Sequence, residues 1–389
     1  MIYKNDYSKL TEMSAILKNE GLDGLSAAVE ILLNEVMKIE RSQHLQAIPY
    51  ERTTERQGYA NGFKPKRINT RIGSLSVDIP QVRESNFYPS TLEKGIRSER
   101  ALRVALAEMY IQGVSTRKVE KITKELCGLS VSSTDVSRAT KLLDEEMEQW
   151  RSRPLGCFPY IFIDARYEKI HDSGCIRDVA VLTAIGIDEQ GNRSLLGVSV
   201  SYSEAEVHWR EFLSSLLKRG LHGVKLVISD AHEGLKAARK KVLAGAQWQR
   251  CQFHLQQNAQ AYVPKIEMRK EVASDIRAIF NAPNEMEAKR LLDKAVEKYK
   301  KGAPKLSEWM ELNILEGLTV FQFPEEHRKR VRTTNGLERI NREILRRTKV
   351  VSIFPNEKSC LRLVTAILME IDQEWSASKK YLNMMTAKD

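Results

Sequence analysis

Two aspartates of this 389-residue chain stand in or directly after apolar segments, where a carboxylate is costly to bury. Asp164 lies in the apolar run at residues 160–165, and Asp230 ends a second run at residues 224–230. A charge among apolar side chains requires a cation or hydrogen-bond donors. One such aspartate usually caps a helix or accepts hydrogen bonds, but two of them make a metal site the alternative interpretation.

A third acid, Glu338, lies in a segment rich in arginine. If a helix begins near residue 335, Glu338 and Asn341 share a stripe that is distinct from the apolar stripe facing the core. Asn335 and Glu338 also match a capping box, in which the glutamate serves only its own helix start. The surrounding cations are suited to phosphate oxygens. They are Arg328, Lys329, Arg330, Arg332, Arg339, Arg342, Arg346, Arg347 and Lys349.

The elements that must position these acids follow from the apolar periodicity. Short runs at residues 160–165, 179–187 and 195–200 predict three strands in hairpin succession. A helix near residues 204–217, a strand at 224–230, another helix and a short strand near residue 250 follow, and residues 255–320 look almost wholly helical. This order predicts an α/β fold with a mixed sheet. Neither a Gly-x-Gly-x-x-Gly turn after the first strand nor a Walker loop is present, which argues against NAD or ATP as cofactor.

The N-terminal part carries a basic segment at residues 51–71, after an amphipathic helix predicted at residues 24–43. In it, Tyr59 and Phe63 alternate with basic side chains and with glycine and proline turn residues. The composition suits a phosphate backbone, although a solvated loop is the simpler interpretation. Alternation at residues 75–79 then predicts a half-buried strand.

Residues 99–150 are predicted to form short helices between polar turns. Ser115 could cap one helix, and Ser132 or Ser133 the next. Two short capped helices suit a helix-turn-helix whose second member reads DNA, but helical hairpins without DNA are also common.

Composition favours a polyanionic partner, because Lys and Arg outnumber Asp and Glu by 62 to 51, a formal net charge of +11. No secretory h-region or run of about 18 apolar residues is present, so we expect a cytoplasmic protein. The five scattered cysteines fit reduced thiols. Cys251 and His254 form half of a zinc-ligand set, but no second pair follows, and we do not expect zinc.

Four segments in this order resemble the Mutator-type transposases of bacterial insertion sequences. They are FIDARY (162–167), VISDAHEGL (227–235), WQRCQFH (248–254) and TTNGLER (333–339). The similarity extends from about residue 58, through GVSTR (113–117), to FPN (354–356), which is most of the chain.

The resemblance implies a ribonuclease-H-like mixed sheet flanked by helices, with a helical insertion and a mainly helical N-terminal DNA-binding region. Asp164, Asp230 and Glu338 would be its catalytic, metal-binding triad. They would hold two Mg²⁺, with Mn²⁺ as the alternative, about 4 Å apart for in-line phosphodiester hydrolysis. The freed 3′-hydroxyl would then attack target DNA.

Further roles follow from the resemblance for Cys251 and His254, and from residue type and spacing for the other candidates. Supporting positions near the acids would be Cys251, His254, His232 and Asn341, although a buried structural pair explains Cys251 and His254 about as well. The DNA-binding candidates are Arg52, Arg56, Lys64, Lys66, Arg67, Arg117, Lys118, Arg138, Arg332, Arg339, Arg342, Arg346 and Arg347.

The expected organisation has five parts. These are a helical and basic DNA-binding region (1–98), a helix-turn-helix-like region (99–150), the first part of the catalytic core (151–254), a helical insertion (255–327), and the glutamate helix with C-terminal helices (328–389). The expected partners are terminal inverted repeats and target DNA near the nucleoid, and a homodimer or larger assembly. A non-catalytic DNA-binding regulator and a structure-specific metal-dependent nuclease are the rival functions.

Overall fold

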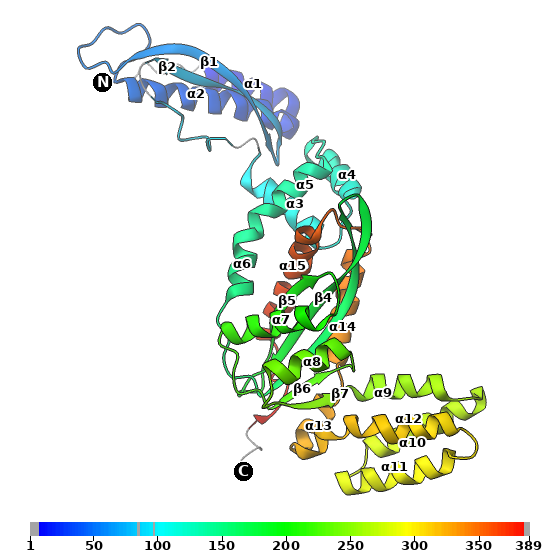
Figure 1. Cartoon of the computed structure of the whole chain (residues 1–389). Coiled ribbons are helices and arrows are strands. Elements are labelled where there is room, and N and C mark those ends of the chain that lie inside the picture. The colour runs from blue at the N-terminus through cyan, green and yellow to red at the C-terminus, as the bar shows by residue number, and fades with distance from the viewer. Residues whose placement is uncertain (1–7, 84–85, 96–97, 385–389) are drawn as a thin grey trace. The chain divides into compact units, whose positions relative to one another are not determined.

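The computed structural model describes residues 8–83, 86–95 and 98–384, which form two compact units, Met1–Leu143 and Asp144–Asp389 (Figure 1). Each unit is described by itself. Among the described helices, none has the length and apolar character needed to cross a membrane.

The first unit begins with α1 (Ser8–Glu20), a 3-10 turn (Gly21–Gly24) and α2 (Leu25–Leu45), followed by the hairpin β1 (Tyr59–Thr70) and β2 (Gly73–Arg83). Met37 of α2 packs with Ile68 and Val77 of the hairpin. The loop interpretation of the basic segment is therefore wrong for residues 59–70. A bulge between Ala60 and Phe63 takes up the Asn-Gly pair, and pairing with β2 supplies the strand hydrogen bonds.

Three helices complete the first unit, namely α3 (Arg100–Ile111), α4 (Thr116–Cys127) and α5 (Ser133–Thr140). The predicted caps are confirmed. Ser115 accepts from the backbone of Lys118, and Ser132 forms a capping box with Asp135. Between α4 and α5 the chain turns at Gly128, whose φ of 64° is readily adopted by glycine. The three helices share an apolar core, so their geometry is that of a compact helical trio.

The second unit is built on a five-stranded mixed sheet in the order β5-β4-β3-β6-β7. As predicted, three hairpin-linked antiparallel strands come first: β3 (Tyr160–Asp172), β4 (Cys175–Ile187) and β5 (Arg193–Ser201). The short strands β6 (Leu226–Ser229) and β7 (Gln247–Arg250) add in parallel on the other side of β3. The carboxyl ends of β6 and β7 thus lie at one edge, next to the middle of β3.

Helices cover both faces of this sheet (Figure 1). On one face, α7 (Glu206–Lys218) and α8 (Glu233–Val242) bury Trp209 and Leu235 against apolar side chains of β3, β4 and β6. The other face is covered by α14 (Asn335–Thr348) and α15 (Glu357–Ser376), and α6 (Asp144–Ser152) packs on α15. The predicted α/β mixed-sheet fold is confirmed.

A helical insertion separates β7 from α14, as expected (Figure 1). Its helices are α9 (Gln252–Ala259), α10 (Arg269–Phe280), α11 (Glu285–Tyr299), α12 (Pro304–Asn313) and α13 (Glu325–Val331), with 3-10 turns at Gln260–Tyr262, Ile266–Met268, Ile314–Gly317 and Thr319–Gln322.

The buried side chain of Gln249 ties the insertion to the sheet. Its amide nitrogen donates to the carbonyls of Arg250 and Gly317, and its amide oxygen accepts from the backbone of Val320 at 2.7 Å. Since buried backbone groups need partners, this one side chain fixes the return of the chain toward α14.

Replacing Gln249 by Leu is expected to lower the free energy of unfolding by about 2 kcal/mol, because the Val320 amide becomes a buried donor without an acceptor. All five tryptophans lie in the second unit, so urea unfolding followed by tryptophan fluorescence reports on that unit. Gln257→Leu, at an exposed position of α9, is the control. Equal midpoints for the two variants would contradict this role of Gln249.

Candidate active site

Asp164 is an interior residue of β3, and side-chain alternation directs it away from the α7/α8 face. It faces α14, where Asn341 Nδ2 donates to its Oδ2 at 2.9 Å. Burial raises the pKa of Asp164 to about 6; His254 opposes this rise, and Asp230 adds to it. The carboxylate therefore lies in a partly desolvated position beside a second acid, where a cation would stabilise its charged form.

Asp230 directly follows β6, the strand that pairs in parallel with β3. Its Oδ1 accepts from the backbone of Ala231 at 2.7 Å, and its Oδ2 lies 4.0 Å from Nδ1 of His254. The parallel register of β3 and β6 thus brings two acids that are far apart in sequence to neighbouring strands.

Glu338 enters from the first turn of α14. The helix is preceded by Thr334, which makes no side-chain cap, and the backbone of Glu338 donates to the carbonyl of Thr334. The capping-box interpretation is therefore wrong, because Asn335 is already inside the helix. The core stripe is confirmed by burial of Leu337, Ile340 and Ile344.

One oxygen of Glu338 has no hydrogen-bond partner although it is buried. This atom, Oε1, lies 3.9 Å from Nε2 of His254, too far for a hydrogen bond. A buried oxygen without a donor is unusual and points to a missing ligand.

Cys251 and His254 connect the sheet edge, α9 and α14. The backbone of Cys251 donates to the carbonyl of Ser229, and its Sγ accepts from the backbone and hydroxyl of Thr334 at 3.4 and 3.3 Å. Burial alone would raise the pKa of the Cys251 thiol, but hydrogen bonds with His254 and Thr334 hold it below its usual value. The same bond with Cys251 raises the pKa of His254 to about 9, and Asp230 contributes. A cationic imidazole thus lies among the carboxylates.

These groups could hold a metal ion once the imidazole has lost its proton, because metal ligands must be deprotonated. Ligand atoms of Cys251, His254 and Glu338 lie within 4.8 Å of one another. The carboxylates of Asp164 and Asp230 interact electrostatically with the same histidine. Carboxylate oxygens suit hard cations such as Mg²⁺, and the unpartnered Oε1 of Glu338 fits such a ligand.

Two residues that the sequence reasoning missed support this site. Arg166 donates through Nη1 to the backbone carbonyl of Asn341 and pairs with Glu168 at 2.9 Å, and Glu168 accepts from Thr348 of α14 at 3.0 Å. Together they fasten α14 to β3. A signal was available, because Asp164, Arg166 and Glu168 stand at alternate positions, although the predicted strand ended at residue 165 and β3 continues to Asp172.

The other predicted site residues lie in varied settings. His232 is exposed, and its Nδ1 lies 3.8 Å from Glu204. Arg332 donates to Asn281 and to a backbone carbonyl, while Arg346 and the buried Arg347 pair with Glu343. Arg347 also pairs with Glu370, so it holds α14 against α15. The remaining cations of this group, Arg339 and Arg342, are exposed on α14.

The predicted DNA-binding cations of the first unit lie mostly at its surface. Arg56 stacks on Tyr59, and Lys66 donates to the hydroxyl of Tyr88 at 2.9 Å. The exposed members are Arg52, Lys64, Arg67, Arg117, Lys118 and Arg138.

Comparisons with known proteins agree with the resemblance noted in the sequence. The family model described as "Transposase, Mutator family" matches residues 1–378. The transposase for insertion sequence element IS406 of Burkholderia multivorans is 59% identical over 95% of this chain and 96% of its own length. The ISRM5 transposase of Rhizobium meliloti is 42% identical (93% and 91%), and the IS256 transposase in transposon Tn4001 of Staphylococcus aureus is 36% identical (96% and 97%).

Among solved structures, a chain of the simian T-cell lymphotropic virus intasome in complex with PP2A regulatory subunit B56 gamma is similar over 41% of this chain and 49% of its own length. It is 14% identical with a TM-score of 0.17, which is too low to support an argument about the fold. The family match and the sequence relatives are sufficient: the chain belongs to the Mutator family of transposases.

Proposed function

We propose that this protein is the DNA transposase of an insertion sequence, which cleaves DNA at element ends and joins the 3′ ends to target DNA. The observation that carries the proposal is the approach of Asp230 and Glu338 to one histidine, with Asp164 in electrostatic contact. These relations to one imidazole support our proposal that the carboxylates from β3, the end of β6 and α14 share one metal site.

The topology supports a ribonuclease-H-like assignment for the second unit. Three antiparallel strands are followed by two parallel ones, and the acids lie on the central strand and at the neighbouring carboxyl end. Ligand sites of open sheets form at such ends. The helical insertion then returns the chain so that α14 brings Glu338 to the same edge.

Asp164, Asp230 and Glu338 would hold the metal ions, and their oxygen ligands favour Mg²⁺ over a softer ion. When bound, a pair of Mg²⁺ would activate a water or 3′-hydroxyl nucleophile and stabilise the leaving oxygen. Zinc remains unexpected, because the catalytic oxygens outnumber the single thiol and imidazole nearby.

The protein's own residues hold the acids in place. Asn341 donates to Asp164, so one oxygen of that carboxylate has a fixed direction. Thr334 binds Cys251, which fixes the start of α14 and hence the position of Glu338. The imidazolium of His254 offsets the repulsion among the acids.

DNA binding is proposed for the exposed cations of the first unit, some of which lie on the capped helices α4 and α5. The five predicted regions remain our proposal for the organisation of the chain. Since two element ends must be joined, we also propose that at least two copies assemble on DNA.

Asp164→Asn, Asp230→Asn or Glu338→Gln is expected to reduce Mg²⁺-dependent strand cleavage and transfer by about a thousandfold or more, because each removes a charged metal ligand. DNA binding should persist. The measurement is cleavage and strand transfer with a duplex bearing the terminal repeat beside the gene. Glu233→Gln is the matched control, since Glu233 is exposed near the site and pairs only with Lys236 among the described residues.

The rival functions predict different results in the same assay. A regulator binds the end sequence without cleaving it, so unchanged activity in the three variants, or none in the native protein, would contradict catalysis by these acids. A nuclease would cleave but never join the 3′ end to a target.

Asn341→Ala is expected to lower cleavage by about 10–100-fold and to raise the Mg²⁺ concentration needed for half-maximal rate, because Asp164 loses its donor. The measurement is the rate of cleavage against Mg²⁺ concentration. Asn258→Ala, at an exposed position of α9, provides the control. An unchanged Mg²⁺ dependence would show that Asn341 has no role in orienting the ligand.

A further inference from the structure

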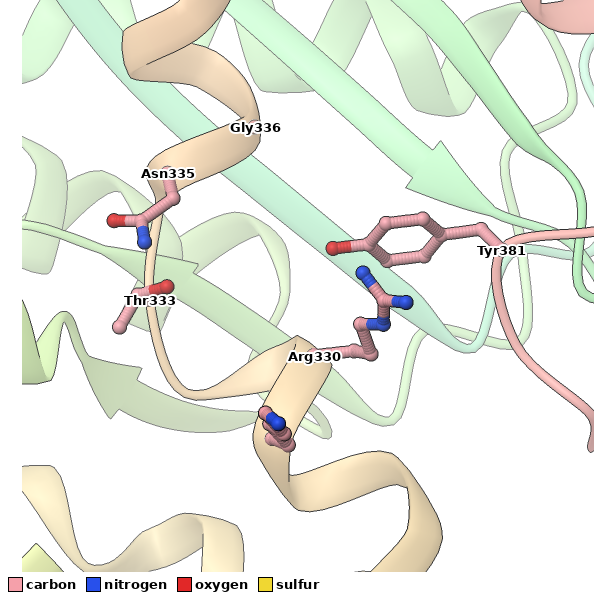
Figure 2. A pocket seen from close by; sticks show the side chains of 6 residues that line it. Arg330, Thr333, Asn335, Gly336 and Tyr381 are labelled. Carbon is pink, nitrogen blue, oxygen red and sulfur yellow. The ribbon is translucent and has the colours of Figure 1, made fainter.

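A hollow lies at the start of α14, and several of the groups that line it can bind anions. Its walls are Lys329, Arg330, Thr333, Asn335, Gly336 and Tyr381, around a volume of about 320 Å³ (Figure 2). The hydroxyl of Tyr381 points toward the start of α14, and the guanidinium of Arg330 lies beside the tyrosine ring (Figure 2). No catalytic acid lines this hollow.

A neighbouring, larger hollow of about 650 Å³ lies along α14. Gly336 lines both, and the second adds Arg193, Arg339 and Arg342. We call the two together the basic channel. Two acids also line it, of which Glu343 is already paired with Arg346 and Arg347, and Glu374 is exposed.

Three guanidinium groups of the channel lie near one another, because Arg193 and Arg330 both stack on Tyr381 and Arg339 lines the same hollow as Arg193. Burial lowers the pKa of Arg193; Tyr381 opposes this effect, and the charges of Arg339 and Arg330 add to it. Within the described part of the chain, none of these three arginines forms an ion pair with a carboxylate. Arranging like charges in this way costs free energy, so a structure that keeps them together is suited to an anion.

Aromatic rings hold these cations without neutralising them. The guanidinium of Arg193 lies between Trp375 and Tyr381, at 4.3 and 4.5 Å from the ring centres, and Arg330 lies 5.0 Å from Tyr381. Cation–π stacking uses the faces of a guanidinium and leaves its N–H edges free for oxygen acceptors.

The C-terminal segment that supplies Tyr381 is fixed to the turn between β4 and β5. The backbones of Tyr381 and Leu382 both donate to the carbonyl of Gly191, at 2.8 and 3.1 Å. Gly191 has a φ of 84°, and a Cβ there would lie 1.9 Å from the carbonyl oxygen of Leu382. Only glycine allows this close approach, so the tyrosine is placed by the backbone rather than by chance.

The first turn of α14 adds donors to the channel. Among the described residues, no hydrogen-bond acceptor is found for the backbone amides of Asn335 and Gly336, and Thr334 makes no side-chain cap. These amides carry the positive end of the helix dipole.

We propose that the basic channel binds backbone phosphates of a DNA strand that runs along α14. This inference rests on the proposed function and deepens it, because it adds a DNA contact separate from the bond that is cut. Glu338 approaches His254, whereas Gly336 and Arg339 line the channel, so one helix carries both an acid of the proposed site and the channel. A channel open along α14 fits a repeating polyanion better than a single small anion.

Binding of the full-length protein to a fluorescent 40-base-pair duplex, measured by anisotropy over a range of salt, tests this proposal. Arg330→Gln is expected to weaken binding by about 3–10-fold and to reduce the slope of log K against log salt by about 1, because one phosphate contact is lost. Arg339→Gln should act in the same direction. Both side chains are exposed, and urea unfolding checks that the variants fold as the native protein does.

Arg269→Gln, an exposed arginine on the helical insertion, is the matched control and should leave affinity and slope unchanged. Native affinity and slope in both Arg330→Gln and Arg339→Gln would overturn the proposal, as would a loss no larger than in the control. Binding of inorganic phosphate to the native protein is followed by tryptophan fluorescence. If millimolar phosphate saturates the native protein, and both variants keep the native slope of log K against log salt with DNA, the channel binds a free anion. That result would overturn the DNA assignment.

The outcome is independent of catalysis. If the native protein binds DNA through the channel but cleaves none, the proposed function fails and the channel stands. If cleavage and transfer occur but the variants bind DNA as the native protein does, the proposed DNA contact is wrong and the proposed function is supported.

Discussion

Placing carboxylates within or directly after apolar strand segments costs free energy, and the contacts around the sheet of the second unit offset this cost. Asp164 follows four buried residues within β3, and Asp230 directly follows the fully buried strand β6. Such charges persist only where donors or cations meet them. Asn341, the backbone of Ala231 and His254 provide this stabilisation in the protein itself, and metal ions would complete it.

That constraint explains why α14 is so firmly held. Arg166 and Glu168 bind it from β3, Cys251 binds the residue before it, and Arg347 joins it to α15. Each link uses a side chain that would be costly to leave unpaired in its partly buried setting. The helix therefore presents Glu338 on one side and a row of arginines on another, and these two sides are assigned to the reaction and to the strand beside it.

Much of this could be predicted from sequence, because local patterns carry it. The strand runs around Asp164 and Asp230, the capping serines and the core stripe of α14 all follow from periodicity and residue type. Residues 59–70 were misinterpreted because glycine and proline signal turns, whereas here a bulge takes up Gly62 and Pro65 pairs with Asp78 within the hairpin. The capping box at Asn335 failed because helix starts depend on the preceding chain. Arg166 and Glu168 stand out by their alternation, but their partners Asn341 and Thr348 are distant in sequence, as Tyr381 is from Arg193, and no local pattern reveals such pairs.

The central claim is that three acids form one metal site, and direct ion binding tests it without requiring catalysis. The measurement is titration of the full-length protein with Mn²⁺, followed by electron paramagnetic resonance, for the native chain and Glu338→Gln. The account predicts saturable binding in the native protein and a loss of about tenfold or more in affinity when Glu338 is neutralised. Mn²⁺ binding of equal affinity in both proteins would contradict it, since Glu338 would then be no part of the site.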